Sequence, residues 1–196
     1  MKILKLDQPG NESDRKLIIN ESAIMLDLNC DQLVKCCNIY EWNNKFHIFI
    51  EFMDGGDLKK LVEQNCLEQS EDFCKWSLYQ VGLGLKAMHD RDILHRDIKA
   101  DNVLYSLNGD IKICDLGFAT FLSELNDYKA SFRGTPCFMA PEVYFGAFYS
   151  KEVDVWSFGC LAYELATGKP PFYDRFMAED MFGRKYQNLD SLIQSL

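Results

Sequence analysis

The stretch His95-Arg96-Asp97-Ile98-Lys99-Ala100-Asp101-Asn102 carries the most information in this sequence, together with Asp115-Leu116-Gly117, which begins thirteen positions after Asn102. The first stretch supplies a candidate proton acceptor, a cation and an amide oxygen, and the second adds a carboxylate. These are the groups needed to move a phosphoryl group from a nucleotide to a hydroxyl. Asp-Leu-Gly alone is a common turn sequence, so its significance comes from its position after the longer stretch.

A short β-hairpin is predicted between the two stretches. The apolar runs Val103-Leu104-Tyr105 and Ile111-Lys112-Ile113 flank Asn108-Gly109, a pair that tolerates the positive φ of a tight turn. Such a hairpin would fold Asp115 back towards Asn102, and one oxygen ligand from each end could share a hard cation. Because Mg²⁺ takes few protein ligands and keeps waters and phosphate oxygens, the sequence predicts a metal-nucleotide site and not a closed protein cage.

Two further motifs extend the pattern. Gly134-Thr135-Pro136-Cys137-Phe138-Met139-Ala140-Pro141-Glu142 precedes Asp154-Val155-Trp156-Ser157-Phe158-Gly159, and the order and spacing of all these motifs resemble those of protein kinases over nearly the whole chain. The resemblance implies an α+β, two-lobed protein-kinase-like fold with a strand-rich N-terminal lobe and a mainly helical C-terminal lobe. It also implies transfer of the γ-phosphoryl group of ATP to protein serine or threonine hydroxyls.

Details of the motifs indicate a subgroup. Lys99 and Thr135 look like the serine/threonine pattern, whereas a tyrosine kinase would be expected to carry Ala-Ala-Arg or Arg-Ala-Ala near positions 99–101. The segments Leu17–Glu21 and His95–Val103 are similar to the p21-activated branch of the Ste20-like kinases. The resemblance implies protein substrates, with an upstream kinase or a small GTPase as a regulator acting through regions outside this chain.

The resemblance also assigns roles to the polar residues of the first two motifs. Asp97 is expected to orient the substrate hydroxyl and to accept its proton. Lys99 is expected to contact the γ-phosphate, where a compact point charge suits a moving phosphoryl oxygen. Asn102 and Asp115 are expected to hold Mg²⁺.

A strand lysine and a helix glutamate are expected to fix the α- and β-phosphates of the nucleotide as an ion pair. We favour Lys2 with Glu21, because Met1 and Ile3 flank Lys2 as strand residues should. Lys5 is the competing assignment, since its spacing to Glu21 suits the p21-activated pattern.

The hinge between the lobes is expected at Ile50-Glu51-Phe52-Met53. By resemblance, Ile50 would guard the inner pocket, backbone groups of Glu51 and Met53 would bind adenine, and Leu104 would close the purine slot from below. A stacked apolar spine, whose alignment marks the active form, is expected from Met25, Cys36, His95 and Leu116, with Leu116 in place of the more usual phenylalanine.

Ser131 is the predicted activating phosphosite, and Arg96, beside the proton acceptor, is placed to pair with its phosphate. Weaker candidates for this modification are Ser123 and Tyr128. By resemblance, Thr135 and Glu142 belong to the end of the activation loop. Glu142 would normally pair with an arginine from a late helix that this chain does not reach.

The expected division is a partial small lobe over residues 1–53 and a large lobe over 54–196. The small lobe is predicted to hold a helix over roughly Arg15–Leu28 and a hairpin formed by Leu33–Trp42 and Phe46–Met53.

Two long helices are predicted in the large lobe. One follows Ser70, and its members at helical spacing are expected to lie in the core, the aromatic ones included: Trp76, Tyr79, Leu83 and Ala87. The other covers Val153–Ala166, is apolar almost all round, and is expected to form the centre of the lobe and to stop at Gly168.

Composition excludes several classes of protein. The chain has 196 residues, is 47% hydrophobic and carries a net charge of −9, which argues against binding along nucleic acid. It holds no run of 18 apolar residues, so no membrane span is expected. The eight cysteines lack zinc-site spacing and are expected to be reduced and mostly buried in a cytoplasmic protein.

A second hypothesis is a catalytically inactive kinase-like scaffold, or a truncated gene product that acts only by binding. No glycine-rich phosphate loop precedes the opening strand, so the chain is expected to be truncated at both ends, to bind ATP weakly and to turn over poorly. Against a pseudokinase stands the complete polar set of Asp97, Lys99, Asn102 and Asp115. A small-molecule phosphotransferase of related fold would not carry the two later motifs.

Overall fold

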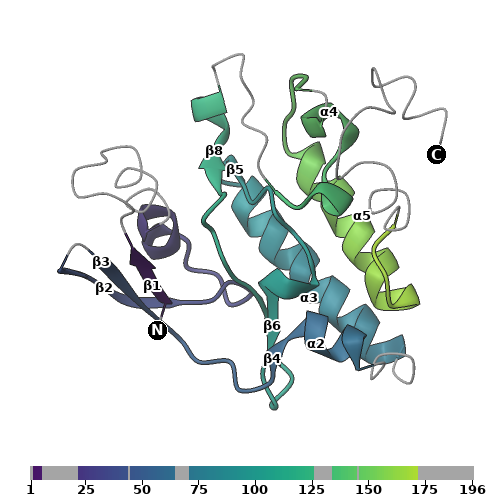
Figure 1. Ribbon diagram of the computed structural model, residues 1–196, viewed down its shortest axis with the longest axis horizontal. Coiled ribbons are helices and arrows are strands. Elements are labelled where there is room, and N and C mark those ends of the chain that lie inside the picture. Colours follow the sequence, from purple (N-terminus) through teal and green to yellow (C-terminus); the bar gives the residue numbers. More distant parts are fainter. Residues whose placement is uncertain are drawn as a thin grey trace.

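The computed structural model describes residues 2–5, 22–43, 45–64, 71–125, 134–144 and 146–171, with only the backbone for 2–5, 124 and 144. Figure 1 shows a strand-rich part at one end of the molecule and helices with short strands at the other. The expected two-lobed α+β architecture is therefore confirmed.

The small sheet has the order β1-β3-β2 and is antiparallel, with β1 at Lys2–Lys5, β2 at Cys36–Trp42 and β3 at Lys45–Ile50. In β3 the buried Phe46 and Ile48 alternate with less buried neighbours, as expected when one face of a sheet is covered. The predicted hairpin is confirmed, although both strands are shorter than expected at the ends away from the turn. Of the predicted helix, residues 22–27 are described and are helical.

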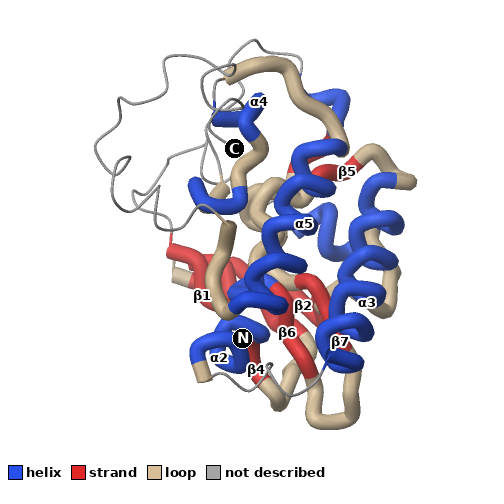
Figure 2. The backbone as a smooth tube through the Cα atoms, turned by 90° about the vertical axis from the view of Figure 1, so that its right-hand side faces the viewer, coloured by secondary structure: helices blue, strands red, loops and turns tan. Residues whose placement is uncertain are grey.

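The helices α3 (Glu71–His89) and α5 (Glu152–Thr167) lie side by side in the large lobe (Figures 1 and 2). Both predicted helices are thus confirmed. Gly168 ends α5 in a left-handed conformation, with φ of 81°, and its amide donates to the Glu164 carbonyl at 2.8 Å. This is the helix end that glycine permits most easily.

The prediction of which face of α3 is buried is wrong. Trp76 and Tyr79 are 48% and 60% exposed, and the buried face instead carries Ser77, Gln80, Val81, Gly84, Leu85 and Met88. The small residue Gly84 decides which face of α3 packs inward, because a Cβ added at this position would lie 2.8 Å from Ile113 Cδ1. Trp76 remains at the surface, where its indole N–H donates to the Gly109 carbonyl at 3.0 Å.

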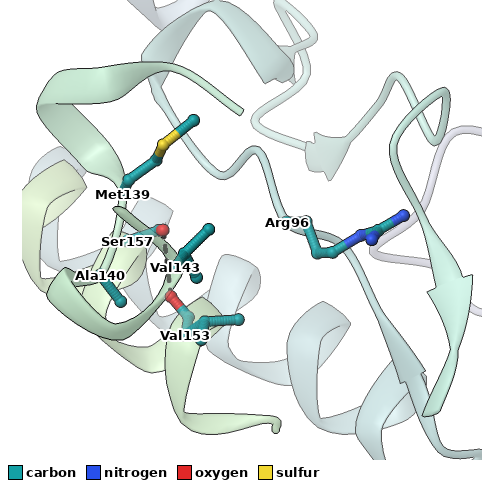
Figure 3. A pocket seen from close by; sticks show the side chains of 6 residues that line it. All are labelled: Arg96, Met139, Ala140, Val143, Val153 and Ser157. Atoms are coloured by element: carbon teal, nitrogen blue, oxygen red, sulfur yellow. Dashed lines mark hydrogen bonds between the residues drawn. The ribbon is translucent and has the colours of Figure 1, made fainter. Parts of the chain in front are cut away.

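The helix α5 also departs from expectation, because it is not buried all round. Val155 and Tyr163 are 59% and 50% exposed. The buried face of α5 carries three polar residues, Asp154, Ser157 and Glu164. The Ser157 hydroxyl lies 2.7 Å from the Phe138 carbonyl and 3.1 Å from that of Val153 (Figure 3). Glu164 pairs with Lys59 through one carboxylate oxygen at 2.8 Å, and its other oxygen has no hydrogen-bond partner among the described residues. Burial raises the pKa of Glu164, and the hydrogen bond and charge of Lys59 oppose this shift. The buried polar groups of α5 thereby attach it to neighbouring elements.

Lys59 belongs to α2 (Leu58–Glu63), which follows the short strand β4 (Gly56–Asp57). This strand starts a second sheet of order β4-β6-β7, in which β6 (Val103–Tyr105) and β7 (Ile111–Ile113) form the predicted hairpin. Only Gly109 of the Asn-Gly pair has positive φ, 95°. The hairpin reverses the direction of the chain, so that Asp115 lies back towards Asn102, as expected.

Shorter elements surround the catalytic motifs. The strands β5 (Ile93–Leu94) and β8 (Thr120–Phe121) pair with each other. The remaining elements are the 3-10 helices η2 (Ala100–Asn102), η3 (Leu122–Leu125) and η4 (Pro136–Phe138) and the helix α4 (Pro141–Tyr144). None of the described helices combines the length and the hydropathy needed to cross a membrane.

All seven cysteines that the structure describes are free thiols. The expectation that most are buried is wrong, because only Cys160 falls in that class and Cys37 is exposed. Burial raises the pKa of Cys160 to about 12, so this thiol stays protonated at neutral pH.

Candidate active site

The loop from His95 to Asn102 is held by a buried carboxylate at the start of α5. Asp154 has no exposed surface, and its two oxygens accept the backbone amides of His95 at 2.9 Å and Arg96 at 2.7 Å. The ring of His89, at the end of α3, lies 2.8 Å from the same carboxylate. Arg96 is in the left-handed region with φ of 67°, and these bonds stabilise that unusual backbone.

The buried ring of His95 joins this loop to the segment that carries Asp115. Its Nδ1 accepts the Asp97 amide at 3.2 Å, and its Nε2 lies 3.2 Å from the Cys114 carbonyl. Because an amide can only donate and a carbonyl can only accept, these partners indicate a neutral ring with hydrogen on Nε2. The ring therefore holds the proton-acceptor loop and the candidate metal loop together.

Asp97 lies at the centre of a hydrogen-bonded cluster. Its side chain is 5% exposed, and its oxygens accept the Thr135 hydroxyl at 2.8 Å and the Asn102 amide at 2.8 Å. The ammonium of Lys99 lies 3.0 Å from the Asp97 carboxylate and donates to the Thr135 hydroxyl at 2.7 Å. The structure thus brings together Asp97, Lys99 and Asn102 with Thr135, which comes from the segment before η4.

The candidate metal ligands fit a hard cation. Asn102 is buried, and its amide nitrogen donates to both the carbonyl and the carboxylate of Asp97 at 2.8 Å. This orientation leaves the Asn102 amide oxygen as the atom that can ligate. Asp115 is exposed with φ of 60°, and the Cys114 amide donates to the Asn102 carbonyl at 2.9 Å, so the two candidate ligands are on adjoining segments. Two oxygen ligands suit Mg²⁺ bound with phosphate and water.

The segment after β3 has the backbone groups expected of an adenine site. The Glu51 amide donates to the Lys35 carbonyl at 3.0 Å, and the Met53 carbonyl accepts from Gly56 at 3.4 Å. Among the described residues, the Glu51 carbonyl and the Met53 amide have no partner, which leaves one acceptor and one donor for a base. Ile50 ends β3, and Leu104 is half-buried on β6.

The structure describes all four expected spine residues. Leu116 is buried in the main core and Met25 packs against that core. His95 is fully buried, and Cys36 lies at the first position of β2.

The side chain of Arg96 extends towards Phe118, in the first part of the segment from Asp115 to Glu142, which we call the activation segment. Figure 3 shows its guanidinium directed away from Met139 and Val143, with which it lines a small pocket. It donates to the Phe118 carbonyl at 2.7 Å and to the Tyr149 hydroxyl at 3.2 Å. Glu142 is half-buried in α4 and forms no ion pair with another described residue.

Several predicted site residues lie outside the described part. Ser131, Tyr128 and Glu21 are among them, as are the side chains of Lys2 and Lys5. In the backbone of β1, Lys2 lies opposite Ile48 and Lys5 opposite Lys45. The choice between the two lysines stays open.

Sequence reasoning missed two supporting residues, Asp154 and His89. Asp154 belongs to one of the sequence motifs, and an acidic residue on the apolar side of a helix is a recognisable signal of a bonded, buried charge. His89 had no such signal, since its role depends on the packing of α3 against α5.

The described residues thus place a buried carboxylate beside a lysine, two candidate cation ligands on adjoining segments, and a backbone acceptor and donor after β3, which is the arrangement expected of a phosphoryl-transfer site. The sequence matches the protein kinase domain over residues 1–193. The chain belongs to the protein kinase domain family.

Relatives place this chain near Ste20-type enzymes. It is 35% identical to the serine/threonine-protein kinase MST20 of Pyricularia oryzae over 88% of this chain and 18% of that protein. It is 36% identical to the serine/threonine-protein kinase STE20 of Yarrowia lipolytica (83% and 14%) and to CLA4 of Candida albicans (81% and 16%). The chain thus spans less than a fifth of the length of these relatives.

Proposed function

We propose that this protein is an ATP-dependent serine/threonine protein kinase of the Ste20-like group. The observation that carries the proposal is the cluster of Asp97, Lys99, Asn102 and Thr135, in which each residue is hydrogen-bonded to another member. A scaffold without catalysis would have no need for this arrangement. The similarity to three serine/threonine-protein kinases supports the same reading.

The chemistry follows from the positions of these groups. Asp97 orients the acceptor hydroxyl and takes its proton, and the hydrogen bonds from Asn102 and Thr135 hold the carboxylate in place. Lys99 moves from its pair with Asp97 to the γ-phosphate when the nucleotide binds. Bound Mg²⁺ would supply neutralisation of the phosphate charge, held by Asn102 and Asp115.

Nucleotide binding involves the other lobe. The Glu51 carbonyl and Met53 amide bind adenine, with Ile50 and Leu104 beside the base. The ion pair to the α- and β-phosphates comes from Glu21 with Lys2, or with Lys5.

The proposal extends to the wider setting of the protein. It includes a small lobe over residues 1–53 and a large lobe over 54–196, protein substrates, an upstream kinase or small GTPase as regulator, and a cytoplasmic location. The free thiols of the described cysteines support that location.

The direct test uses the metal dependence of nucleotide binding. Asp115→Asn is expected to weaken binding of a fluorescent ATP analogue in Mg²⁺ by about 10-fold or more, because it removes one charged ligand. Without Mg²⁺ the variant and the parent should bind alike. Asp72→Asn, an exposed change on α3, is the control. Equal Mg²⁺-dependent affinity in Asp115→Asn and the control would contradict the assigned metal site.

Ser131 is the proposed activating phosphosite. A phosphate there would add up to about two negative charges for Arg96 to pair with, which would order the activation segment. Ser131→Ala is therefore expected to reduce kcat by about 10-fold or more, and mass spectrometry of the active protein should find Ser131 phosphorylated. Ser123→Ala, at a weaker candidate position for the same modification, should leave kcat near that of the parent, so this comparison distinguishes the two positions. Full activity of Ser131→Ala would remove this switch from the proposal.

A further inference from the structure

A second charged pair connects the hinge to the strand that leads to the candidate metal site. Glu51 directly follows β3, and Lys112 is the middle residue of β7. The Lys112 ammonium lies 2.8 Å and 2.9 Å from the two carboxylate oxygens of Glu51. Their side chains are only 11% and 26% exposed, so solvent screens this pair far less than the surface pairs of the molecule.

The backbone of Lys35 adds a third contact. Its amide donates to the Glu51 carboxylate at 2.6 Å, and its carbonyl accepts the Glu51 amide at 3.0 Å. The segment just before it is bonded to β7, because the Val34 amide donates to the Ile113 carbonyl at 2.9 Å and the Ile113 amide to the Gln32 carbonyl at 2.8 Å. Residues 32–35 therefore lie between the hinge and β7 and bond to both.

The energetics favour a positioning role over a simple contribution to stability. A buried ion pair returns little net stability, because desolvation of both charges offsets their attraction. Removing one partner alone leaves the other buried and uncompensated, which is costly. Such a pair is therefore sensitive to the relative placement of its two elements.

The location of the Glu51–Lys112 pair makes the relative placement of the hinge and β7 important for nucleotide binding. Glu51 carries the carbonyl proposed to bind adenine, and Lys112 precedes Asp115 by three positions on the same strand and loop. The adenine end of the nucleotide would thus be bound at Glu51, and the phosphate end, with its metal ion, at Asp115. A contact between Glu51 and Lys112 connects the two ends.

We propose that Glu51, Lys112 and the backbone of Lys35 form a hinge latch, in which Glu51 and Lys112 act as positioning residues for the nucleotide. The latch holds the hinge backbone against β7, so that the adenine contacts and the metal ligand keep a constant separation. The effect on ATP rests on the proposed function, whereas the effect on the hinge backbone does not.

The first measurement is hydrogen exchange of the amides of residues 51–56 in the protein without nucleotide. Lys112→Met and Glu51→Gln are each expected to raise exchange by about 10-fold, since each removes charge-assisted hydrogen bonds. Amide exchange in the double variant should be no faster than in either single variant. Lys112→Arg keeps the charge and the donors and should stay near the parent.

The control is Lys86→Met, which breaks the 2.6 Å pair of Lys86 with Asp90, whose side chains are 68% and 61% exposed. It should leave the exchange of residues 51–56 unchanged. Additive increases in the double variant, or unchanged exchange in both single variants, would overturn the latch.

The second measurement is ATP affinity beside thermal stability. Lys112→Met and Glu51→Gln are expected to weaken ATP binding by about fivefold or more at a temperature where each variant is fully folded, although each lowers the melting temperature by leaving one charge uncompensated. The double variant removes both charges, so its melting temperature should lie closer to that of the parent while its ATP affinity stays low. A loss of affinity that merely tracked a loss of folded protein would refute a positioning role. If the parent bound no ATP while hinge exchange still rose in both variants, the latch would stand and the proposed function would fail.

Discussion

Asp97→Asn is expected to abolish protein phosphorylation while ATP binding survives. Loss of a positioned general base costs about 10²–10⁴-fold in rate, and an asparagine cannot accept the hydroxyl proton. The neighbours of Asp97 explain why the site should stay assembled. An asparagine can keep its oxygen towards the Asn102 amide and turn its own amide towards Thr135, so both neighbours retain a partner.

Two assays with one control check this expectation. Transfer of labelled phosphate to a generic basic protein substrate reports turnover, and a fluorescent ATP analogue reports binding. Asp101→Asn, an exposed change within the same loop, should behave like the parent in both assays. Near-normal turnover by Asp97→Asn would show that the assigned mechanism is wrong.

Asp154→Asn is expected to cause the largest loss of stability, about 3–5 kcal/mol in the free energy of unfolding. The carboxylate is fully buried and faces the amides of His95 and Arg96 and the ring of His89. An amide group at this position would place N–H hydrogens against at least one of these donors. The backbone of Arg96 would then lose the bonds that stabilise its positive φ.

Urea denaturation measures this loss, and Glu152→Gln is the matched control. Glu152 is exposed in the first turn of the same helix, so it shares the helix-dipole effect but has no buried donors. Phosphorylation should fall in Asp154→Asn even under conditions where the variant is folded, because the loop carrying Asp97 shifts. A stability equal to that of Glu152→Gln would contradict the proposed anchoring role.

Local signals in the sequence determined much of the architecture. The hairpin between Asn102 and Asp115, the end of α5 at Gly168 and the two long helices all follow from turn residues and hydrophobic periodicity. These features depend on neighbours in the chain, so a short window contains the information. The proximity of Asp97, Lys99 and Asn102 is also determined locally, because these residues share one loop.

Tertiary structure alone decided which distant groups meet. Thr135 contacts Asp97 across 38 positions, and Lys112 contacts Glu51 across 61 positions. No local pattern selects such partners, since a buried charge accepts donors from whichever element packs beside it.

The buried face of α3 has the same origin. Helical spacing predicts which residues share a side but not which side packs inward, and here the close approach of Gly84 to Ile113 placed Trp76 and Tyr79 at the surface. Backbone conformation is thus largely a local property of this sequence, whereas the partners of its charged and aromatic side chains are set by how the elements pack.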